Sequence, residues 1–215
     1  MRRCWAFDVE GTLLRLPVAI DEVREALRAL AAARGIERRF SPLLPAIAET
    51  AAELGAAFLE EAYALIERYE LAAAPSATLC EGARELLAAA DSHGEPVLLV
   101  SNSSAAALRA AFRSCGLVPG ERALVGRRPG LPPKPDPAPL LEAVAALSGE
   151  ESAGLLLCVG DRVPDALMAR AAAPVLRAHG FEVRAIGVAS DERARARLLE
   201  AGADQVIASL LELAL

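Results

Sequence analysis

Short apolar runs alternate with helical patterns through most of this chain, and this alternation limits the possible fold more than any other feature. Six runs have the length of strands: Cys4–Val9, Val97–Val100, Ala123–Val125, Leu155–Val159, Val183–Val188 and Gln205–Ala208. Several are apolar at every position, which is typical of parallel strands that helices cover on both faces. Helices are expected between them, at Glu81–Ala90, Ala105–Cys115, Pro137–Leu147, Pro164–His179 and Asp191–Ala201. Strands alternating with helices form βαβ units, so the sequence predicts an α/β fold with an open parallel sheet.

One long segment interrupts the alternation with helical patterns alone. No convincing strand occurs within Leu14–Ala77, whereas Asp21–Ala33 carries apolar residues at helical spacing. A second helical stretch, Ser41–Leu71, is expected to break near Gly55. Ser41 is expected to cap this stretch, with the proline after it in the first helical position. The sequence therefore predicts an all-helical insert after the first strand.

The two patterns divide the chain into two expected domains. Residues 1–13 and 79–215 are predicted to form the α/β domain, and residues 14–78 a small helical domain inserted into it. A chain of 215 residues suffices for this arrangement, since about 150 residues is typical of one domain. Hydrophobic residues make up 54% of the chain and charged residues 24%, a balance that excludes a disordered or fibrous protein.

Charge and hydropathy exclude several classes of partner. The net charge of −6 argues against nucleic acid or an anionic membrane as the natural ligand. No window offers the roughly 20 uncharged apolar residues of a membrane span. Asp8 and Glu10 cut the first apolar stretch too early for a secretory signal, and four widely separated cysteines suggest neither a zinc site nor a disulfide framework. We expect a soluble, cytoplasmic protein.

Two carboxylate residues lie close together at the end of the first predicted strand. Asp8 and Glu10 lie two residues apart and lead into a turn at Gly11. Ligands of open α/β sheets bind at the carboxyl ends of the strands, so both side chains can face one small site, and a glycine allows the tight turn. Taken alone, Phe7–Thr12 fits an ordinary strand end with a capping aspartate equally well.

Polar residues also follow the second predicted strand. Ser101 and Asn102 lie directly before a predicted helix, where a hydroxyl, an amide and free N–H groups form a natural anion site. The alternative is simple capping of that helix, which Ser103 or Ser104 can provide. Both interpretations remain open from these residues.

Lysine is used once in this chain, at Lys134, among 23 lysine and arginine residues. Asn102 is likewise its only asparagine. A single lysine in an arginine-rich chain indicates a place where a planar guanidinium cannot replace a compact ammonium. The alternative is that Lys134 is a solvated side chain that has been retained by chance.

A pair of aspartates follows the fourth predicted strand. Asp161 and Asp165 are spaced i, i+4 at the start of a predicted helix. Carboxylates in this position suit a hard cation such as Mg²⁺, which prefers oxygen ligands. They also suit the positive end of the helix dipole, so a helix cap is the alternative.

The four groups of residues, in this order, resemble the motifs of the haloacid dehalogenase-like hydrolase superfamily. Those motifs are DxDGT, [ST]N, a lysine and GDxxxD, and this chain has DVEGT, SN, KPDP and GDRVPD in their place. The chain is most similar to the phosphoglycolate phosphatase-like branch, whose last strand and helix resemble Ala203–Leu210. The resemblance covers nearly the whole chain. It implies a Rossmann-like core with a helical cap that acts as a lid over the site.

The resemblance also implies a reaction and a role for each motif residue. The reaction is Mg²⁺-dependent hydrolysis of a small phosphorylated metabolite through an aspartyl phosphate, with Asp8 as nucleophile and Glu10 as general acid and base. The Mg²⁺ ligands would come from Asp8, the backbone carbonyl of Glu10, Asp161 and Asp165. The phosphate oxygens would be bound by Gly11, Thr12, Ser101, Asn102 and Lys134, and Lys134 would bridge phosphate and nucleophile.

Glu10 is the main departure from the family pattern, because most phosphatases of this family have aspartate there. Glutamate keeps the carboxylate but extends its reach by about 1.5 Å. A DxEGT motif resembles that of the enolase-phosphatases, which differ at the second motif, so their substrate is not transferred. Tyrosine or alanine at this position would indicate dehalogenase or phosphonate-cleaving chemistry, and neither is present.

Other functions and roles stay open at this stage. A phosphomutase of the same superfamily, or a catalytically impaired ligand-binding member marked by Glu10, would share these motifs. A receiver domain is disfavoured by the insert and the GDxxxD motif. Arg38 and Arg39 lie where such caps contact the leaving group, and they are either substrate ligands or solvated; Arg15, beside the hinge, is equally ambiguous. The chain is expected to be a monomer or a homodimer.

Overall fold

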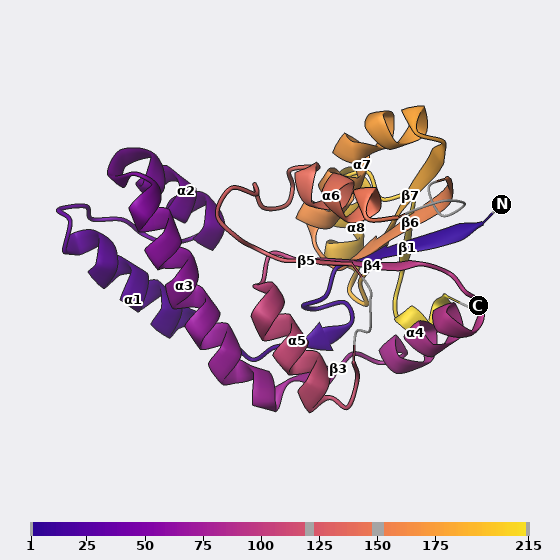
Figure 1. Ribbon diagram of the computed structural model, residues 1–215, viewed down its shortest axis with the longest axis horizontal. Coiled ribbons are helices and arrows are strands. Elements are labelled where there is room, and N and C mark those ends of the chain that lie inside the picture. The colour runs from indigo at the N-terminus through magenta and orange to yellow at the C-terminus, as the bar shows by residue number, and fades with distance from the viewer. Residues whose placement is uncertain (1, 119–122, 148–152, 214–215) are drawn as a thin grey trace.

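The computed structural model of the chain describes residues 2–118, 123–147 and 153–213 (Figure 1). Its centre is a six-stranded sheet with the order β5-β4-β1-β6-β7-β8, in which every neighbouring pair is parallel. The strands are β1 (Arg3–Phe7), β4 (Val97–Val100), β5 (Leu124–Val125), β6 (Gly154–Gly160), β7 (Phe181–Val188) and β8 (Gln205–Ile207). The predicted α/β fold with an open, Rossmann-like parallel sheet is confirmed.

Helices cover both faces of this sheet, as parallel strands require. They are α4 (Ala83–Ser92), α5 (Ala105–Ser114), α6 (Ala138–Ala145), α7 (Val163–Ala178) and α8 (Glu192–Glu200). Because successive side chains of a strand point to opposite faces, Trp5 and Phe7 of β1 pack with α4 and α5. Cys4 and Ala6 pack with α6 and α7 on the other face. The core of the domain is thus two apolar layers with β1 between them.

The insert consists of three helices with a core of their own. They are α1 (Ile20–Ala32), α2 (Leu43–Leu54) and α3 (Ala56–Ala73), and the expected break at Gly55 separates the last two. Their buried residues, such as Leu27, Ile47 and Phe58, form a separate apolar cluster. Figure 1 shows α1 and α2 at the left of the molecule, with α3 running back toward α5.

Two expectations for the insert are wrong. Leu14 and Arg15 form a short strand, β2 (Leu14–Arg15), which pairs antiparallel with β3 (Thr78–Leu79). Strands of two residues carry no periodicity that a sequence pattern can reveal. Ser41 does not cap α2: Pro42 has an extended ψ of 152°, so the helix begins at Leu43 with no side-chain cap bond. The serine hydroxyl therefore lies one residue too early for capping.

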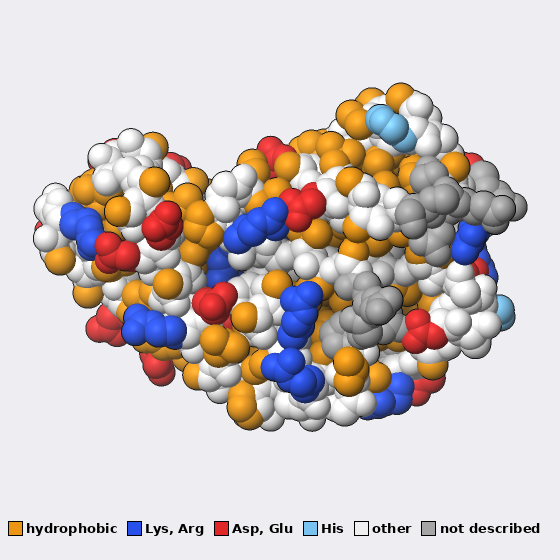
Figure 2. All heavy atoms as spheres, in the orientation of Figure 1, with side chains coloured by type: hydrophobic (Ala, Val, Ile, Leu, Met, Phe, Trp, Pro, Cys, Tyr) orange, Lys and Arg blue, Asp and Glu red, His pale blue; other side chains and the backbone are white. Residues whose placement is uncertain are grey.

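The surface carries both charged and apolar side chains. Figure 2 shows basic and acidic side chains interspersed with apolar ones over the face drawn, and its outline is indented between the insert and the sheet domain. Among the helices of the described residues, none has both the length and the apolar character needed to cross a bilayer.

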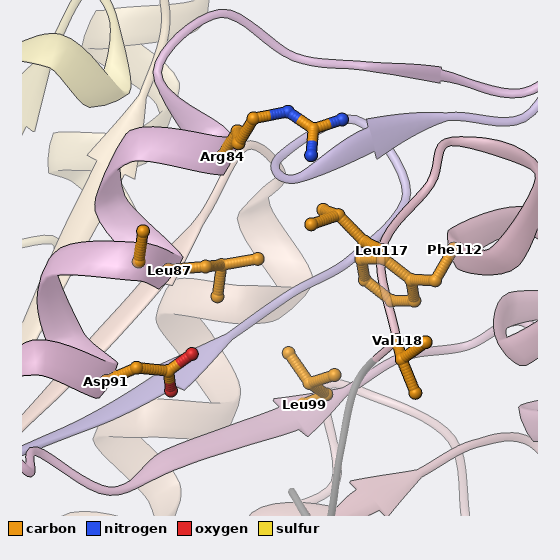
Figure 3. Close-up of a pocket in the computed structure, with 8 residues that line it drawn as sticks. Arg84, Leu87, Asp91, Leu99, Phe112, Leu117 and Val118 are labelled. Atoms are coloured by element: carbon orange, nitrogen blue, oxygen red, sulfur yellow. The ribbon is translucent and has the colours of Figure 1, made fainter.

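One apolar pocket lies between α4 and α5 (Figure 3). Its walls are formed by Leu87, Leu99 and Phe112, with Arg84 and Asp91 at its edges. The Arg84 guanidinium donates to the carbonyl of Cys115 at 2.8 Å, which ties α4 to the end of α5. None of the motif residues identified from the sequence lines this pocket.

Candidate active site

The predicted site residues meet at the carboxyl end of the sheet, because each follows a strand or precedes a helix there. One pocket is lined by Asp8, Glu10, Ser101, Asn102, Ser103, Lys134, Arg162, Pro164 and Asp165. The remaining predicted residues, Gly11, Thr12 and Asp161, line a second pocket, and the Thr12 hydroxyl bonds to Asp8 Oδ2 at 3.3 Å and to Asp161 Oδ1 at 3.2 Å. The structure therefore places all nine candidates around one edge of the sheet.

The centre of the site is the ammonium group of Lys134. Its Nζ donates to Asp8 Oδ1 at 2.5 Å, to Asp165 Oδ1 at 2.5 Å and to the carbonyl of Val100 at 3.1 Å. All three side chains are buried. An ammonium offers three donors from one compact atom, and all three are used here. A planar guanidinium cannot reproduce this arrangement, which gives a physical reason for a lysine at this position.

Burial and charge oppose one another in this group. Burial raises the pKa of Asp8, although the neighbouring Lys134 counteracts it. Burial likewise raises the pKa of Asp165 to about 6. Burial would lower the pKa of Lys134, but the carboxylates of Asp165 and Asp8 hold it above its usual range. Lys134 therefore remains an ammonium, and the carboxylates favour a further positive charge.

An acidic cluster beside Lys134 fits a divalent cation. Asp8, Asp161 and Asp165 each offer a carboxylate oxygen, and these oxygens lie within 4.8 Å of one another. Burial, and then the charge of Asp165, raises the pKa of Asp161. Three carboxylates and one ammonium leave a net charge of about −2 when all are ionised, and hard divalent cations prefer such oxygen ligands. The donor set and its charge therefore match the group that the sequence predicted.

Two glycines allow the carboxylates to approach the backbone. Gly11 has φ +98°, and a Cβ on it would lie 2.5 Å from Asp161 Oδ2. A Cβ on Gly160 would lie 2.4 Å from the Cβ of Asp165. Real Cβ atoms do not approach so closely, so both positions require glycine. The glycines of DVEGT and GDRVPD thus have a steric role in the acidic cluster.

The loop after β4 caps the following helix and also lines the pocket. Ser104 caps α5, because its Oγ accepts from the backbone N–H of Ala107 at 3.2 Å. Ser101 is buried and lines the pocket, and its Oγ accepts from the N–H of Ser103 at 3.2 Å. The helix is therefore capped by the last serine, while the first faces the site.

Asn102 contacts the loop that carries Lys134. Its Oδ1 accepts from the backbone N–H of Lys134 at 2.9 Å, and its Nδ2 donates to the carbonyl of Lys134 at 3.2 Å. This paired contact fixes the backbone from which the ammonium extends. The sequence predicted Asn102 as a phosphate ligand, and the structure gives it a positioning contact that motif spacing does not reveal.

Glu10 lies at the mouth of the pocket in a different environment from Asp8. Its Oε2 accepts from an Nη of Arg162 at 3.4 Å, and about a third of its side chain is exposed. Burial raises the pKa of Glu10, and the charge of Arg162 opposes that rise. Arg162 was not among the sequence-based candidates, although it stands inside the GDRVPD motif. Its position between two motif aspartates is the signal that could have identified it.

The arginines near the insert fall outside the pocket that holds Lys134. Arg38 pairs with Glu49 at 3.0 Å and with Glu53, both on α2, so it is held within the insert. Arg39 is exposed. Arg15 lies on β2 and lines the pocket that contains Gly11.

Comparison with known proteins places the chain in a family. A family model described as haloacid dehalogenase-like hydrolase matches residues 3–173. No curated protein matches the sequence.

Among solved structures, a putative haloacid dehalogenase-like hydrolase from Bacteroides fragilis is 19% identical, with a TM-score of 0.68 and full coverage of both chains. CbbY from Rhodobacter sphaeroides, in complex with phosphate, is 20% identical, with a TM-score of 0.66 over 99% of this chain and 96% of that one. A mutant of CbbY in complex with xylulose-(1,5)bisphosphate is 20% identical, with a TM-score of 0.65 and the same coverage. These structures share the fold of this chain.

The acidic cluster generates a prediction about Gly11. If the cluster binds Mg²⁺, the ion should raise the melting temperature of the wild type, and Gly11→Ala should abolish that rise, because the added Cβ displaces the Asp161 carboxylate. Gly35→Ala is the matched control: Gly35 also has a positive φ, of +80°, but open space around it, so it bears only the backbone strain. Thermal unfolding over a Mg²⁺ titration measures both. An equal Mg²⁺ response in the two variants would contradict the assignment.

The raised carboxyl pKa values generate a second prediction. Protons and the cation compete for the same oxygens, and Asp165 holds its proton up to about pH 6 in the cation-free protein. The apparent affinity for Mg²⁺ should therefore weaken as the pH falls through 6, approaching about tenfold per pH unit for one displaced proton. Calorimetric titration between pH 7.5 and pH 5, in buffers of different ionisation enthalpy, checks affinity and proton release together. An affinity independent of pH would refute this competition.

Proposed function

The chain belongs to the haloacid dehalogenase-like hydrolase family, and on that premise we propose that it is a Mg²⁺-dependent phosphatase acting on a small phosphomonoester. The observation that carries the proposal is the buried Lys134 ammonium, shared by Asp8 and Asp165 beside the Ser101 loop. A carboxylate paired with an ammonium, next to a serine at a helix N-terminus, suits attack on phosphorus. Its setting is proposed to be the cytoplasm.

The balance of charge at the site indicates why both Lys134 and a divalent cation would be needed. A phosphate dianion that approaches the three ionised aspartates brings the total to about five negative charges. One pair of unit charges 4 Å apart is worth about 4 kcal/mol at an effective dielectric of about 20. Lys134 and a divalent cation would supply about three positive charges, so substrate binding becomes feasible. The same charges would stabilise the transferring phosphoryl group, whose charge is spread over its oxygens.

The proposed reaction has two displacements at phosphorus. Asp8 attacks with a carboxylate oxygen, the bond to the leaving oxygen breaks, and Glu10 donates a proton to that oxygen. Glu10 then accepts a proton from water, which attacks the aspartyl phosphate and releases inorganic phosphate, restoring Asp8. Mg²⁺, held by Asp8, Asp161, Asp165 and the Glu10 carbonyl, would supply charge neutralisation for both displacements.

The environments of the two carboxylates favour different roles. Asp8 is buried against Lys134, which keeps a nucleophilic carboxylate ionised, whereas Glu10 lies at the mouth, where a leaving group exits. The raised pKa of Glu10 favours its acidic form, as proton donation requires. A pair of carboxyl groups with distinct environments is how acid and nucleophile are separated in many hydrolases.

The structural neighbours suggest a substrate class. CbbY has been crystallised with phosphate and, as a mutant, with a sugar bisphosphate. A small phosphorylated metabolite of this kind is the proposed substrate for this chain. A phosphomutase would use the same first displacement, and release of inorganic phosphate distinguishes the two reactions.

The nucleophile assignment is tested with p-nitrophenyl phosphate. Hydrolysis should require Mg²⁺, and Asp8→Asn should lower kcat by at least about 10³-fold, because an amide cannot form the acyl phosphate. Asp21→Asn is the matched control, since Asp21 is exposed and pairs with Arg24 on its own helix. If Asp8→Asn kept its Mg²⁺-dependent activity, the mechanism would be wrong. An inactive wild-type protein on this ester leads to a screen of sugar phosphates, and failure there refutes the phosphatase.

The role of Glu10 is tested by trapping the intermediate. Glu10→Gln keeps the shape of the side chain but cannot exchange a proton, so kcat should fall by about 10²–10⁴-fold. With an activated aryl ester the phosphorylated protein should accumulate, because the leaving group needs no acid while the water still needs a base. Acid-quenched intact mass measures the phosphoprotein. An unchanged kcat, or a wild-type protein that itself stops at the phosphorylated state, would contradict the role assigned to Glu10.

A further inference from the structure

A buried ion pair joins the last helix of the insert to the loop Ser101–Ser104, which lines the pocket that contains Lys134. Arg127, which follows β5, donates from its two Nη atoms to both carboxylate oxygens of Glu70 on α3, at 2.8 Å and 2.9 Å. The Arg127 and Glu70 side chains are only 3% and 5% exposed. The two residues are far apart in sequence, one in the insert and one in the sheet domain.

Both partners also contact the backbone of the Ser101–Ser104 loop. Glu70 Oε2 accepts from the N–H of Ser104 at 3.0 Å. An Nη of Arg127 donates to the carbonyl of Asn102 at 2.7 Å, and the Arg127 N–H donates to the carbonyl of Ser103 at 2.9 Å. The pair therefore holds this loop at three successive residues.

The surrounding structure leaves this pair little freedom. The Arg127 guanidinium lies 5.2 Å from the ring centroid of Tyr63, also on α3. A Cβ on Gly126 would lie 2.5 Å from the backbone nitrogen of Ala105, so the strand end and the start of α5 are in direct contact. Figure 1 shows α3 running beside α5, and the two helices are in contact. The C-terminal end of α3 is thus anchored on the sheet domain.

The loop in turn positions Lys134, because both polar atoms of the Asn102 side chain bond to the Lys134 backbone. We propose that Glu70 and Arg127 are positioning residues for the reaction, which hold the phosphate-binding loop, and through Asn102 the lysine, in catalytic geometry. This inference rests on the proposed function. It also makes the insert part of the active-site framework, in addition to any role as a lid.

The alternative is that the pair serves stability alone, and its chemistry separates the two roles. Apolar residues of similar volume often replace a buried ion pair with no loss of stability, because two charges no longer need to be desolvated. Such residues cannot bond to the Ser104 N–H or the Asn102 carbonyl. A displacement of about 1 Å in a catalytic group can cost about 10²-fold in rate. Loss of activity in a variant that remains folded at the assay temperature is therefore the signature of positioning.

The test is the double variant Glu70→Leu/Arg127→Met. Its melting temperature should fall only modestly, because the Ser104 N–H and the Asn102 carbonyl lose their partners, while kcat/KM for p-nitrophenyl phosphate falls at least about tenfold at a temperature where the variant is folded. The inhibition constant for inorganic phosphate should rise with it, because the loop binds that anion. The matched control is Arg3→Met/Glu95→Leu, which removes a 2.6 Å ion pair at the opposite, amino-terminal end of the sheet and, like the test variant, leaves a buried donor, Trp5 Nε1, without its acceptor. This control should leave both constants unchanged.

Amide hydrogen exchange provides a readout that does not depend on activity. The peptide containing Ser104 should exchange faster in the double variant than in the wild type or the control, because its N–H loses Glu70. If the wild type neither hydrolyses nor binds phosphate, the proposed function fails, and this measurement alone decides whether the pair holds the loop. Unchanged exchange, or unchanged phosphate constants in a folded double variant, overturns the inference. Should the double variant fold poorly, Glu70→Gln is measured in the same way.

Discussion

The site depends on one buried ammonium. Lys134 is held by two carboxylates from different elements, Asp8 after β1 and Asp165 in the first turn of α7, together with a carbonyl of β4. Without that charge, three aspartates at one edge of the sheet would repel one another in a poorly hydrated place. With it, the cluster keeps a net charge of about −2, which one divalent cation would neutralise. The ammonium therefore permits the acidic cluster to form, and the negative charge that it does not neutralise favours binding of a metal ion.

The sequence predicted most of the fold because several of its strands, such as β4 and β6, are continuous runs without a charged residue. β4 was predicted residue for residue, and the other strands of the sheet within a few residues. The site residues could be predicted for a related reason: parallel strands end at the same edge, so polar residues after successive strands must converge. The rarity of lysine added an independent signal, since Lys134 lies where a guanidinium does not fit. Each signal is local in the sequence, and the parallel topology brings the residues that carry it to the same edge of the sheet.

What the sequence could not predict are contacts between distant segments with no periodic pattern. The pairing of β2 with β3 involves two residues on each side, too few for any alternation. The contact between Glu70 and Arg127 joins α3 of the insert to the segment after β5, and neither residue belongs to one of the sequence motifs. Nothing in either segment identifies the other, so only the three-dimensional structure reveals the pair. The same holds for Asn102, whose polar side chain suits a phosphate ligand and a backbone clamp equally well.

Glu10 shows how the environment, rather than the residue type, separates two carboxylates that leave the same strand. Asp8 follows β1 at the edge of the sheet and is buried against Lys134, so it has little contact with bulk water. Glu10 turns outward to Arg162 and keeps part of its surface in solvent. The additional methylene therefore extends a side chain that already points to the mouth, where the leaving group and water must pass. Glutamate at this position lengthens the reach of the proposed acid without disturbing the buried Asp8, the proposed nucleophile, so the departure from the family motif is compatible with the proposed reaction.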